Sequence, residues 1–157
     1  GHGPLAAAAA QAAVRAFDAA PAGSPATLVE TLHRAISHTR GAALAIAEWD
    51  RDANLVRYAG LGNISGSIIG PDGARRGLVS LPGIAGHQRR QVRQLDYPFP
   101  PGSVLVMHSD GVADRWQFDA YPGLQHRSVQ VISATILRDA GVRRDDACVL
   151  VVREPVG

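Results

Sequence analysis

Three aspartates in two distant parts of the chain are the residues whose type and position best suit metal-assisted chemistry. Asp110 follows a short apolar run at 104–107, whereas Asp145 and Asp146 come directly before a second apolar run at 147–152. If the two runs are antiparallel strands of one sheet, both acidic ends lie at the same edge. Carboxylates gathered there repel one another unless cations lie between them. The pattern indicates an oxygen-ligand site for Mg²⁺ or Mn²⁺, with two unrelated acidic turns as the alternative.

The residues around Asp110 suggest how this carboxylate is held in place. Valine and leucine at 104–106 favour a buried strand. An unpaired carboxylate is costly inside a core, so Asp110 should lie where the strand leaves it. Gly111 allows the backbone to turn sharply there. A carboxylate held rigidly at a sheet edge suits a metal ligand.

The sequence argues against several other chemistries. All 16 basic residues are arginines, which excludes Schiff-base chemistry and a Walker-type phosphate loop, because both need a lysine amine. Ser109 has His108 and Asp110 as neighbours, but adjacent side chains of an extended strand point to opposite faces. The chain also lacks the Gly-x-Ser-x-Gly turn of serine hydrolases. A serine hydrolase is therefore dismissed.

The six histidines do not form a zinc signature. His33 and His38 are five residues apart and do not share a helix face, and no pair has the spacing of a zinc site. His108 follows the apolar run and is best interpreted as a hydrogen-bonded residue near the core. His2 and His87 lie in glycine-rich loops, where a functional role stays open.

Length and composition indicate one globular domain over residues 1–157, with 46% hydrophobic and 19% charged residues. No apolar run approaches the roughly 18 residues of a membrane span, so we expect no membrane partner. The net charge of +2 and the scattered arginines, Arg75 and Arg76 among them, favour a solvated surface over a nucleic-acid site. Cys148 is the single cysteine, which excludes an internal disulfide and agrees with a cytoplasmic location.

The elements that must position these residues follow from hydrophobic periodicity. Ser24 is expected to cap a helix that begins with Pro25, and short connections favour antiparallel strands. Helices kept apart from the strands indicate a layered α+β fold, not a doubly wound parallel sheet. Residues 114–123 are expected to form a surface segment packed by its aromatic side chains. We predict helices at 5–20, 25–38 and 128–140, and strands at 43–49, 55–61, 64–69, 76–81, 91–97, 104–107 and 147–152.

Three short motifs, in order along the chain, resemble a known family. Gly1-His2-Gly3, Ser109-Asp110-Gly111 and Asp145-Asp146-Ala147 look like the metal-dependent protein phosphatases of type 2C, and most like their bacterial SpoIIE-type branch. Residues 58–64 and 83–87 resemble members in which this domain follows a kinase-like ATP-binding domain. Such proteins are similar to regulators of partner-switching pathways in stress-response signalling.

The resemblance implies a fold of two stacked antiparallel β-sheets flanked by helices, with a binuclear Mn²⁺ or Mg²⁺ centre at one end. Asp110 and Asp145 would be its catalytic metal ligands, and Asp146 would support the metal site at most indirectly. The implied reaction is hydrolysis of phosphoserine or phosphothreonine by a metal-activated water, without a phosphoenzyme. The implied partner is a phosphorylated regulatory protein similar to an anti-sigma antagonist.

The chain departs from the family pattern in two places. The family has a metal-binding Asp and Gly before the position of Gly1, and neither these nor the strands expected before them are part of this sequence; Cys148 also replaces the more usual Thr. We therefore expect weak metal binding and little or no activity from this exact polypeptide, and phosphatase activity from the parent protein. The alternatives are a catalytically degenerate phosphatase fold that serves as a binding or regulatory module, and a metal-free structural domain.

Overall fold

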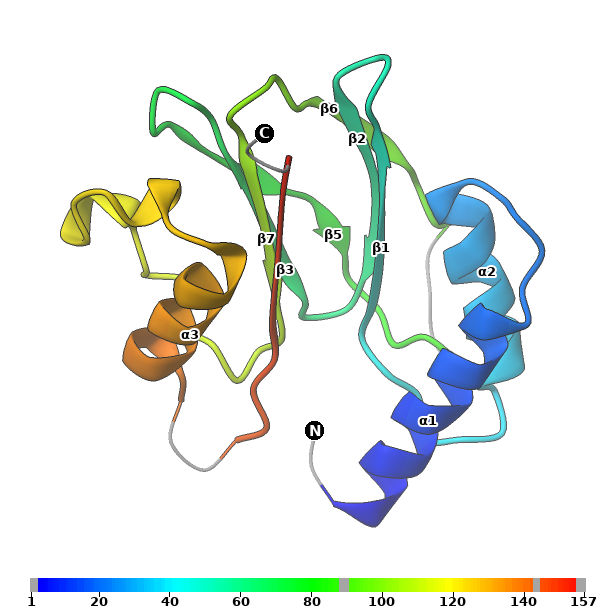
Figure 1. Ribbon diagram of the computed structural model, residues 1–157. Coiled ribbons are helices and arrows are strands. Elements are labelled where there is room, and N and C mark those ends of the chain that lie inside the picture. The colour runs from blue at the N-terminus through cyan, green and yellow to red at the C-terminus, as the bar shows by residue number, and fades with distance from the viewer. Residues whose placement is uncertain (1–2, 88–90, 143–144, 155–157) are drawn as a thin grey trace. The chain divides into compact units, whose positions relative to one another are not determined.

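The computed structural model describes residues 3–87, 91–142 and 145–154. The chain forms two compact units, one of residues 1–64 and 79–98 and the other of residues 65–78 and 99–157. Each unit contains a mostly antiparallel β-sheet with helices packed against it (Figure 1). The predicted α+β class, with two mostly antiparallel sheets, is confirmed. No helix in the described parts of the chain has the length and hydropathy needed to cross a membrane.

The first unit consists of two helices and a four-stranded sheet. Strand β2 is central, because it pairs antiparallel with β1 and β6 and parallel with β5. Val29 and Leu61 belong to the buried core that the helices share with the sheet. The elements are α1 (Pro4–Asp18), α2 (Pro25–Ala35), β1 (Leu44–Asp50), β2 (Leu55–Leu61), β5 (Ser80–Leu81) and β6 (Leu95–Pro98).

Local hydrogen bonds explain where α2 begins and ends. The Ser24 hydroxyl accepts a hydrogen bond from the Thr27 backbone N–H at 3.3 Å, which confirms the predicted N-cap. The helix ends at Ala35, three residues before the predicted end at 38. Beyond it, the Thr39 hydroxyl donates to the Ile36 carbonyl at 2.7 Å, so this segment closes into a turn instead of another helical turn.

The second unit carries the sheet on which the candidate site lies. The order of its strands is β4-β3-β7-β8, and every neighbouring pair is antiparallel. Helix α3 packs against β8, and two short 3₁₀ helices lie between β7 and α3 in the chain (Figure 1). The elements are β3 (Ser65–Ile69), β4 (Arg75–Leu78), β7 (Val104–His108), η1 (Phe118–Ala120), η2 (Leu124–His126), α3 (Val129–Ala140) and β8 (Val149–Arg153).

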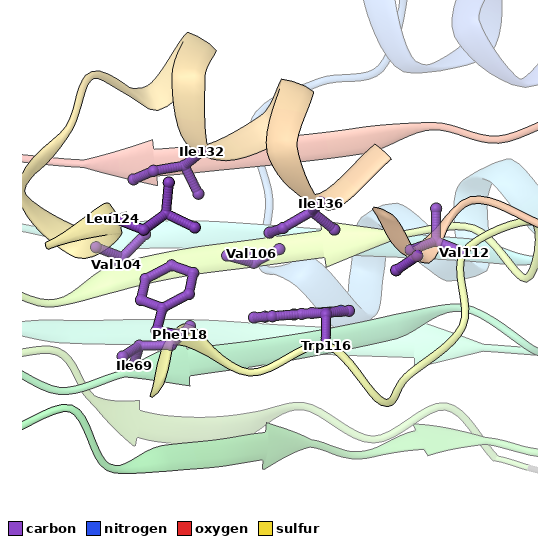
Figure 2. Close-up of a cluster of buried hydrophobic side chains, with 10 residues drawn as sticks. Ile69, Val104, Val106, Val112, Trp116, Phe118, Leu124, Ile132 and Ile136 are labelled. Atoms are coloured by element: carbon purple, nitrogen blue, oxygen red, sulfur yellow. The ribbon is translucent and has the colours of Figure 1, made fainter. Parts of the chain in front are cut away.

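One hydrophobic cluster forms the core of the second unit (Figure 2). Ile132 and Ile136 of α3 share this cluster with Val106 of β7. Trp116 and Phe118 belong to it as well, with only 5% and 8% of their surface exposed. The segment at 114–123 was predicted to lie on the surface, but its aromatic rings reach the core because each buries a large apolar area.

Three predicted strands differ from the observed ones by more than one residue at an end. The run at 76–81 is two strands in two different sheets, since β4 ends at Leu78 and β5 begins at Ser80. The chain passes from one unit to the other at Val79, which is 52% exposed. The sequence pattern did not reveal this change of sheet, because the β-favouring residues Leu78 and Val79 continue through the crossing point without a turn residue. Strand β6 begins at Leu95 instead of 91, and β8 at Val149 instead of 147.

Candidate functional site

The two segments that carry the aspartates meet at one edge of the second sheet. Strands β7 and β8 are antiparallel, and His108 at the end of β7 pairs with Val149 at the start of β8. Asp110 lies just past the end of β7, and Asp145 and Asp146 lie just before the start of β8. The predicted antiparallel pairing of the two apolar runs is therefore confirmed.

Ser109 joins the two segments through its backbone and its side chain. Its backbone N–H donates to the Cys148 carbonyl at 3.1 Å. Its Oγ accepts from the Cys148 backbone N–H at 3.0 Å and lies 3.5 Å from the Asp146 carbonyl oxygen, to which it donates. These bonds extend the pairing of β7 and β8 past the ends of both strands.

Gly111 allows the two segments to approach at van der Waals contact. A Cβ placed on Gly111 would overlap the Asp146 carbonyl oxygen and lie 3.0 Å from the Ala147 Cα. On the other side of the turn, the Gly111 carbonyl accepts a 2.7 Å hydrogen bond from the Val142 N–H. The Val112 N–H donates back to the Ser109 carbonyl at 3.1 Å, which closes a tight turn with Asp110 in it.

The three aspartates are exposed at this edge. Asp145 Oδ1 accepts a hydrogen bond from the Asp146 backbone N–H at 2.9 Å, so one of its oxygens shapes the local turn. Carboxylate oxygens that remain open to water are the donors that Mg²⁺ and Mn²⁺ prefer. Within residues 3–87, 91–142 and 145–154, however, no three His, Cys, Asp or Glu side chains gather closely enough to hold a metal ion. The donor type fits a metal, and the metal-binding roles of Asp110, Asp145 and Asp146 stay a prediction.

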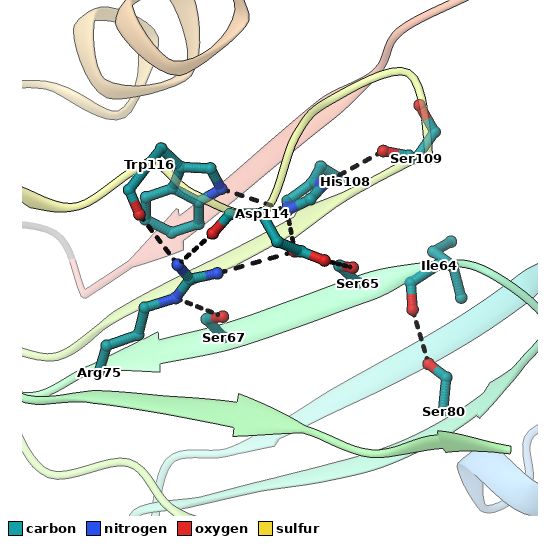
Figure 3. A network of polar contacts seen from close by, with 9 residues as sticks. All are labelled: Ile64, Ser65, Ser67, Arg75, Ser80, His108, Ser109, Asp114 and Trp116. Atoms are coloured by element: carbon teal, nitrogen blue, oxygen red, sulfur yellow. Dashed lines mark hydrogen bonds and ion pairs between the residues drawn. The ribbon is translucent and has the colours of Figure 1, made fainter. Parts of the chain in front are cut away.

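His108 is buried beside the candidate site in a polar network (Figure 3). The Trp116 indole N–H donates to His108 Nε2 at 3.2 Å, and His108 Nδ1 lies 3.0 Å from the Ser109 carbonyl oxygen. Because an indole N–H only donates, Nε2 is the acceptor and the Nδ1 hydrogen donates to Ser109. Asp114 Oδ1 also lies 3.2 Å from Nε2; this contact is an ion pair only when Nε2 carries a proton, so it is an alternative to the bond from Trp116. The interpretation of His108 as a hydrogen-bonded residue near the core is confirmed.

Arg75 of β4 binds the segment that follows the Asp110 turn (Figure 3). Its Nη1 donates to the carbonyl oxygens of Asp114 and Trp116 at 2.8 and 2.9 Å, and its Nε donates to Ser67 Oγ at 2.9 Å. The guanidinium carbon lies 4.0 Å from the centre of the Trp116 ring. Loss of solvent around the guanidinium lowers the pKa of Arg75, and the Asp114 carboxylate opposes that shift. Arg75 therefore lies at the surface, as the sequence suggested, but its guanidinium is bonded to protein groups and stacked on a ring.

Two histidines of the first unit hold backbone in place. The Gly86 N–H donates to His33 Nδ1 at 3.0 Å, and His87 Nε2 lies 2.7 Å from the Thr39 carbonyl oxygen. These contacts tie the loop at 82–87 to the end of α2. Of the histidines left open by the sequence, His87 thus has a structural role, whereas His2 lies outside the described residues, as does Gly1 of the first motif.

Sequence reasoning did not identify Arg75 or Asp114 as part of this region. Arg75 and its carbonyl partners are 39 and 41 residues apart in the chain, and no local motif marks such a contact. The available signal was an aspartate and a tryptophan shortly after the Ser109-Asp110-Gly111 motif, which were interpreted as part of a surface segment.

Solved structures with the same fold belong to bacterial signalling and phosphatase proteins. A chain described with the bacterial stressosome, "a modular system that has been adapted to control secondary messenger signaling", has a TM-score of 0.86 and 28% identity over 98% of this chain and 80% of that one. RsbX in complex with magnesium has a TM-score of 0.77 and 19% identity over 96% of this chain and 75% of its own. The Mycobacterium tuberculosis serine/threonine phosphatase PstP/Ppp has a TM-score of 0.71 and 16% identity, covering 94% and 81%. The chain thus has the fold of the type 2C phosphatases.

The family assignment rests on the sequence as a whole. No protein of curated function matches it significantly. The family model for Stage II sporulation protein E (SpoIIE) matches residues 1–155. This match covers both units and all three motifs, so the branch suggested by the motifs is confirmed, and the chain belongs to the SpoIIE family.

Proposed function

We propose that the chain is the catalytic domain, residues 1–157, of a metal-dependent protein phosphatase that hydrolyses phosphoserine or phosphothreonine. The observation that carries this proposal is the meeting of the Asp110 turn and the Asp145–Asp146 segment at one sheet edge in a chain of the SpoIIE family. The two segments that carry these aspartates are held together there by hydrogen bonds between Ser109 and Cys148.

Asp110 and Asp145 are the proposed ligands of a binuclear Mn²⁺ or Mg²⁺ centre, with Asp146 beside them. When bound, such ions activate a water for attack on phosphorus and offset the negative charge of the phosphoryl group. The protein's part is to fix the two carboxylates through Ser109 and Gly111 while leaving them exposed to solvent. RsbX, a protein of the same fold, has been solved with magnesium, which agrees with a hard divalent ion here.

Ser109 is not proposed as a nucleophile. Its Oγ is engaged with the Cys148 N–H and the Asp146 carbonyl, and the neighbouring His108 presents its nitrogens to Trp116 and to the Ser109 carbonyl. No base therefore contacts the Ser109 hydroxyl in this part of the second unit. This arrangement favours direct attack by water over a phosphoenzyme.

The proposed substrate is a phosphorylated regulatory protein similar to an anti-sigma antagonist, in a cytoplasmic partner-switching pathway. The support for this class is the likeness at 28% identity to a chain described with the bacterial stressosome. The aspartates at this sheet edge are exposed. With metal bound, they would be accessible to a phosphorylated side chain of a folded partner.

A catalytically degenerate domain that serves as a binding or regulatory module is the second candidate. The observation that favours it is the lack of a three-residue metal-binding group among the described residues. Such a domain would bind its regulatory partner without turning it over.

One experiment separates the two candidates. Hydrolysis of a phosphoserine peptide is measured with Mn²⁺ for the full-length protein, because little activity is expected of residues 1–157 alone. The wild type is compared with Asp110→Asn and with the control Asp119→Asn, an exposed aspartate of η1 in the same unit. Changes at residues that only support metal ligands usually reduce activity by about 10–100-fold. Loss of the proposed ligand Asp110 should therefore reduce turnover by at least about 100-fold, and the control should remain active. Equal turnover by all three proteins would refute the phosphatase proposal, and no turnover by the wild type would favour the binding module.

A further inference from the structure

We propose that Arg75 is a positioning residue that fixes the Asp110 turn through Asp114, Trp116 and His108. This inference rests on the proposed function, because it assigns the purpose of the turn to metal binding. Arg75 itself touches none of the three candidate ligands in any contact that the structure shows, so its effect must pass through its partners.

The guanidinium of Arg75 joins the backbone after the turn to the neighbouring strand. Nη1 contacts both the Asp114 and the Trp116 carbonyl oxygens, and Nε contacts Ser67 Oγ on the neighbouring strand β3. Nη2 lies 3.8 Å from Asp114 Oδ1. The side chain is 28% exposed, which strengthens these bonds relative to those of a fully solvated arginine.

The same network reaches both ends of the turn. Downstream, Arg75 holds Asp114 and Trp116, which follow Asp110 by four and six residues. Upstream, Trp116 donates to His108, and His108 contacts the Ser109 carbonyl directly before Asp110. The Ser109 carbonyl also accepts the Val112 N–H that closes the turn. The network therefore restrains the backbone on each side of the candidate ligand (Figure 3).

Only arginine can make this set of contacts. Its planar fork donates in several fixed directions and stacks on the Trp116 ring at 4.0 Å. A lysine ammonium is a point charge that cannot span both carbonyl oxygens and Ser67 while stacking on the ring. A lysine at position 75 should therefore keep the charge and lose the restraint.

A purely structural role would stabilise the whole second unit, whereas a positioning role is local to the turn. Amide hydrogen exchange separates the two without any enzyme assay. The Val112 and Ala113 N–H groups are hydrogen-bonded to the Ser109 and Ala140 carbonyls and report on the turn. The N–H of Val106, at the centre of β7, reports on the sheet.

The test uses the full-length protein, metal-free for amide exchange and with added Mn²⁺ for titration calorimetry. The variants are Arg75→Lys and Trp116→Phe, the milder second change that keeps a stacking ring but removes the donor to His108. Arg76→Lys is the matched control, because the next residue of a strand points to the opposite face.

For Arg75→Lys we expect exchange of the Val112 and Ala113 amides to rise about 10-fold, with Val106 unchanged, and the Kd for Mn²⁺ to rise about 10-fold. Trp116→Phe should change the same amides in the same direction, and Arg76→Lys should change none. An equal rise at Val106, or no rise at Val112 and Ala113, would overturn the inference. If the wild type binds no Mn²⁺, the proposed function fails, and the exchange data alone then decide whether Arg75 restrains the turn.

Discussion

The backbone carbonyl of Asp146 lies so close to Gly111 that no Cβ fits between them. This contact brings the segment before β8 against the turn after β7, where the candidate ligand Asp110 lies. A methyl group at position 111 would push the two acidic segments apart. Gly111 does not have a positive φ. A glycine is therefore needed at this position because the Asp146 backbone comes so close, and not because the chain adopts a left-handed conformation.

Gly111→Ala should lower the free energy of unfolding by about 1–3 kcal/mol, the usual cost of overpacking. Its Mn²⁺ affinity should fall as well, because the Asp146 backbone must move away. Urea unfolding and calorimetry measure the two effects. Gly77→Ala in β4 is the matched control: a Cβ there meets nothing within 4 Å, and the change should stay within about 0.5 kcal/mol. Equal stability of the two variants would contradict the packing argument.

Ser109→Ala tests whether the serine is a structural bridge or a nucleophile. The variant loses the bond from the Cys148 N–H, which should cost about 0.5–1.5 kcal/mol of stability. Turnover should fall by about 10–100-fold, as for other residues that support metal ligands. A catalytic nucleophile would instead cost on the order of 10⁶-fold. Ser133→Ala in α3, which removes an exposed hydroxyl bonded to the Gln130 carbonyl, is the control for both measurements.

Asp139 provides a test of the electrostatics at the end of α3. The Arg138 guanidinium, with N–O distances of 2.6 and 2.7 Å, and secondarily the Tyr121 hydroxyl lower the pKa of Asp139 to about 2. Because the folded pKa lies below the unfolded value, the ionised form favours the folded state above about pH 4. This contribution disappears as the pH falls toward 2.

NMR titration of the Asp139 carboxyl group checks this prediction. Arg138→Gln should return the pKa of Asp139 toward about 3.9, the ordinary value. Arg127→Gln removes an equal charge just before the N-terminus of α3, and it should leave the pKa of Asp139 near 2. A wild-type Asp139 that titrates near the ordinary value would show that the ion pair does not persist in solution.

Features set by neighbouring residues could be predicted from the sequence. The Ser24 cap depends on residues three apart, and the apolar runs that became β7 and β8 are continuous in the chain. Antiparallel pairing of these runs followed from the assumption that they share a sheet, and it placed Asp110 and Asp145 at the correct edge.

Features that depend on distant partners could not be predicted in this way. The interruption at Val79 reflects a change of sheet, and no turn residue marks it between Leu78 and Ser80. Trp116 enters the core because its ring packs with residues of β7 and α3, and Arg75 binds it across 41 residues of sequence. Arg75 lies at the surface, as the sequence indicated, but its hydrogen bonds to Asp114 and Trp116 depend on the fold and not on the neighbouring residue Arg76.

The central claim is that Asp110 and Asp145 bind the same metal centre, and Mn²⁺ titration calorimetry on single and double variants of the full-length protein tests it most directly. Asp110→Asn, Asp145→Asn and the double variant are compared with wild type and the control Asp119→Asn. Each single change should weaken Mn²⁺ binding by at least about 10-fold, and the double variant should lose less than the sum of the two effects, because the residues share one site. Unchanged binding in either single variant, or strictly additive losses, would contradict the shared metal centre.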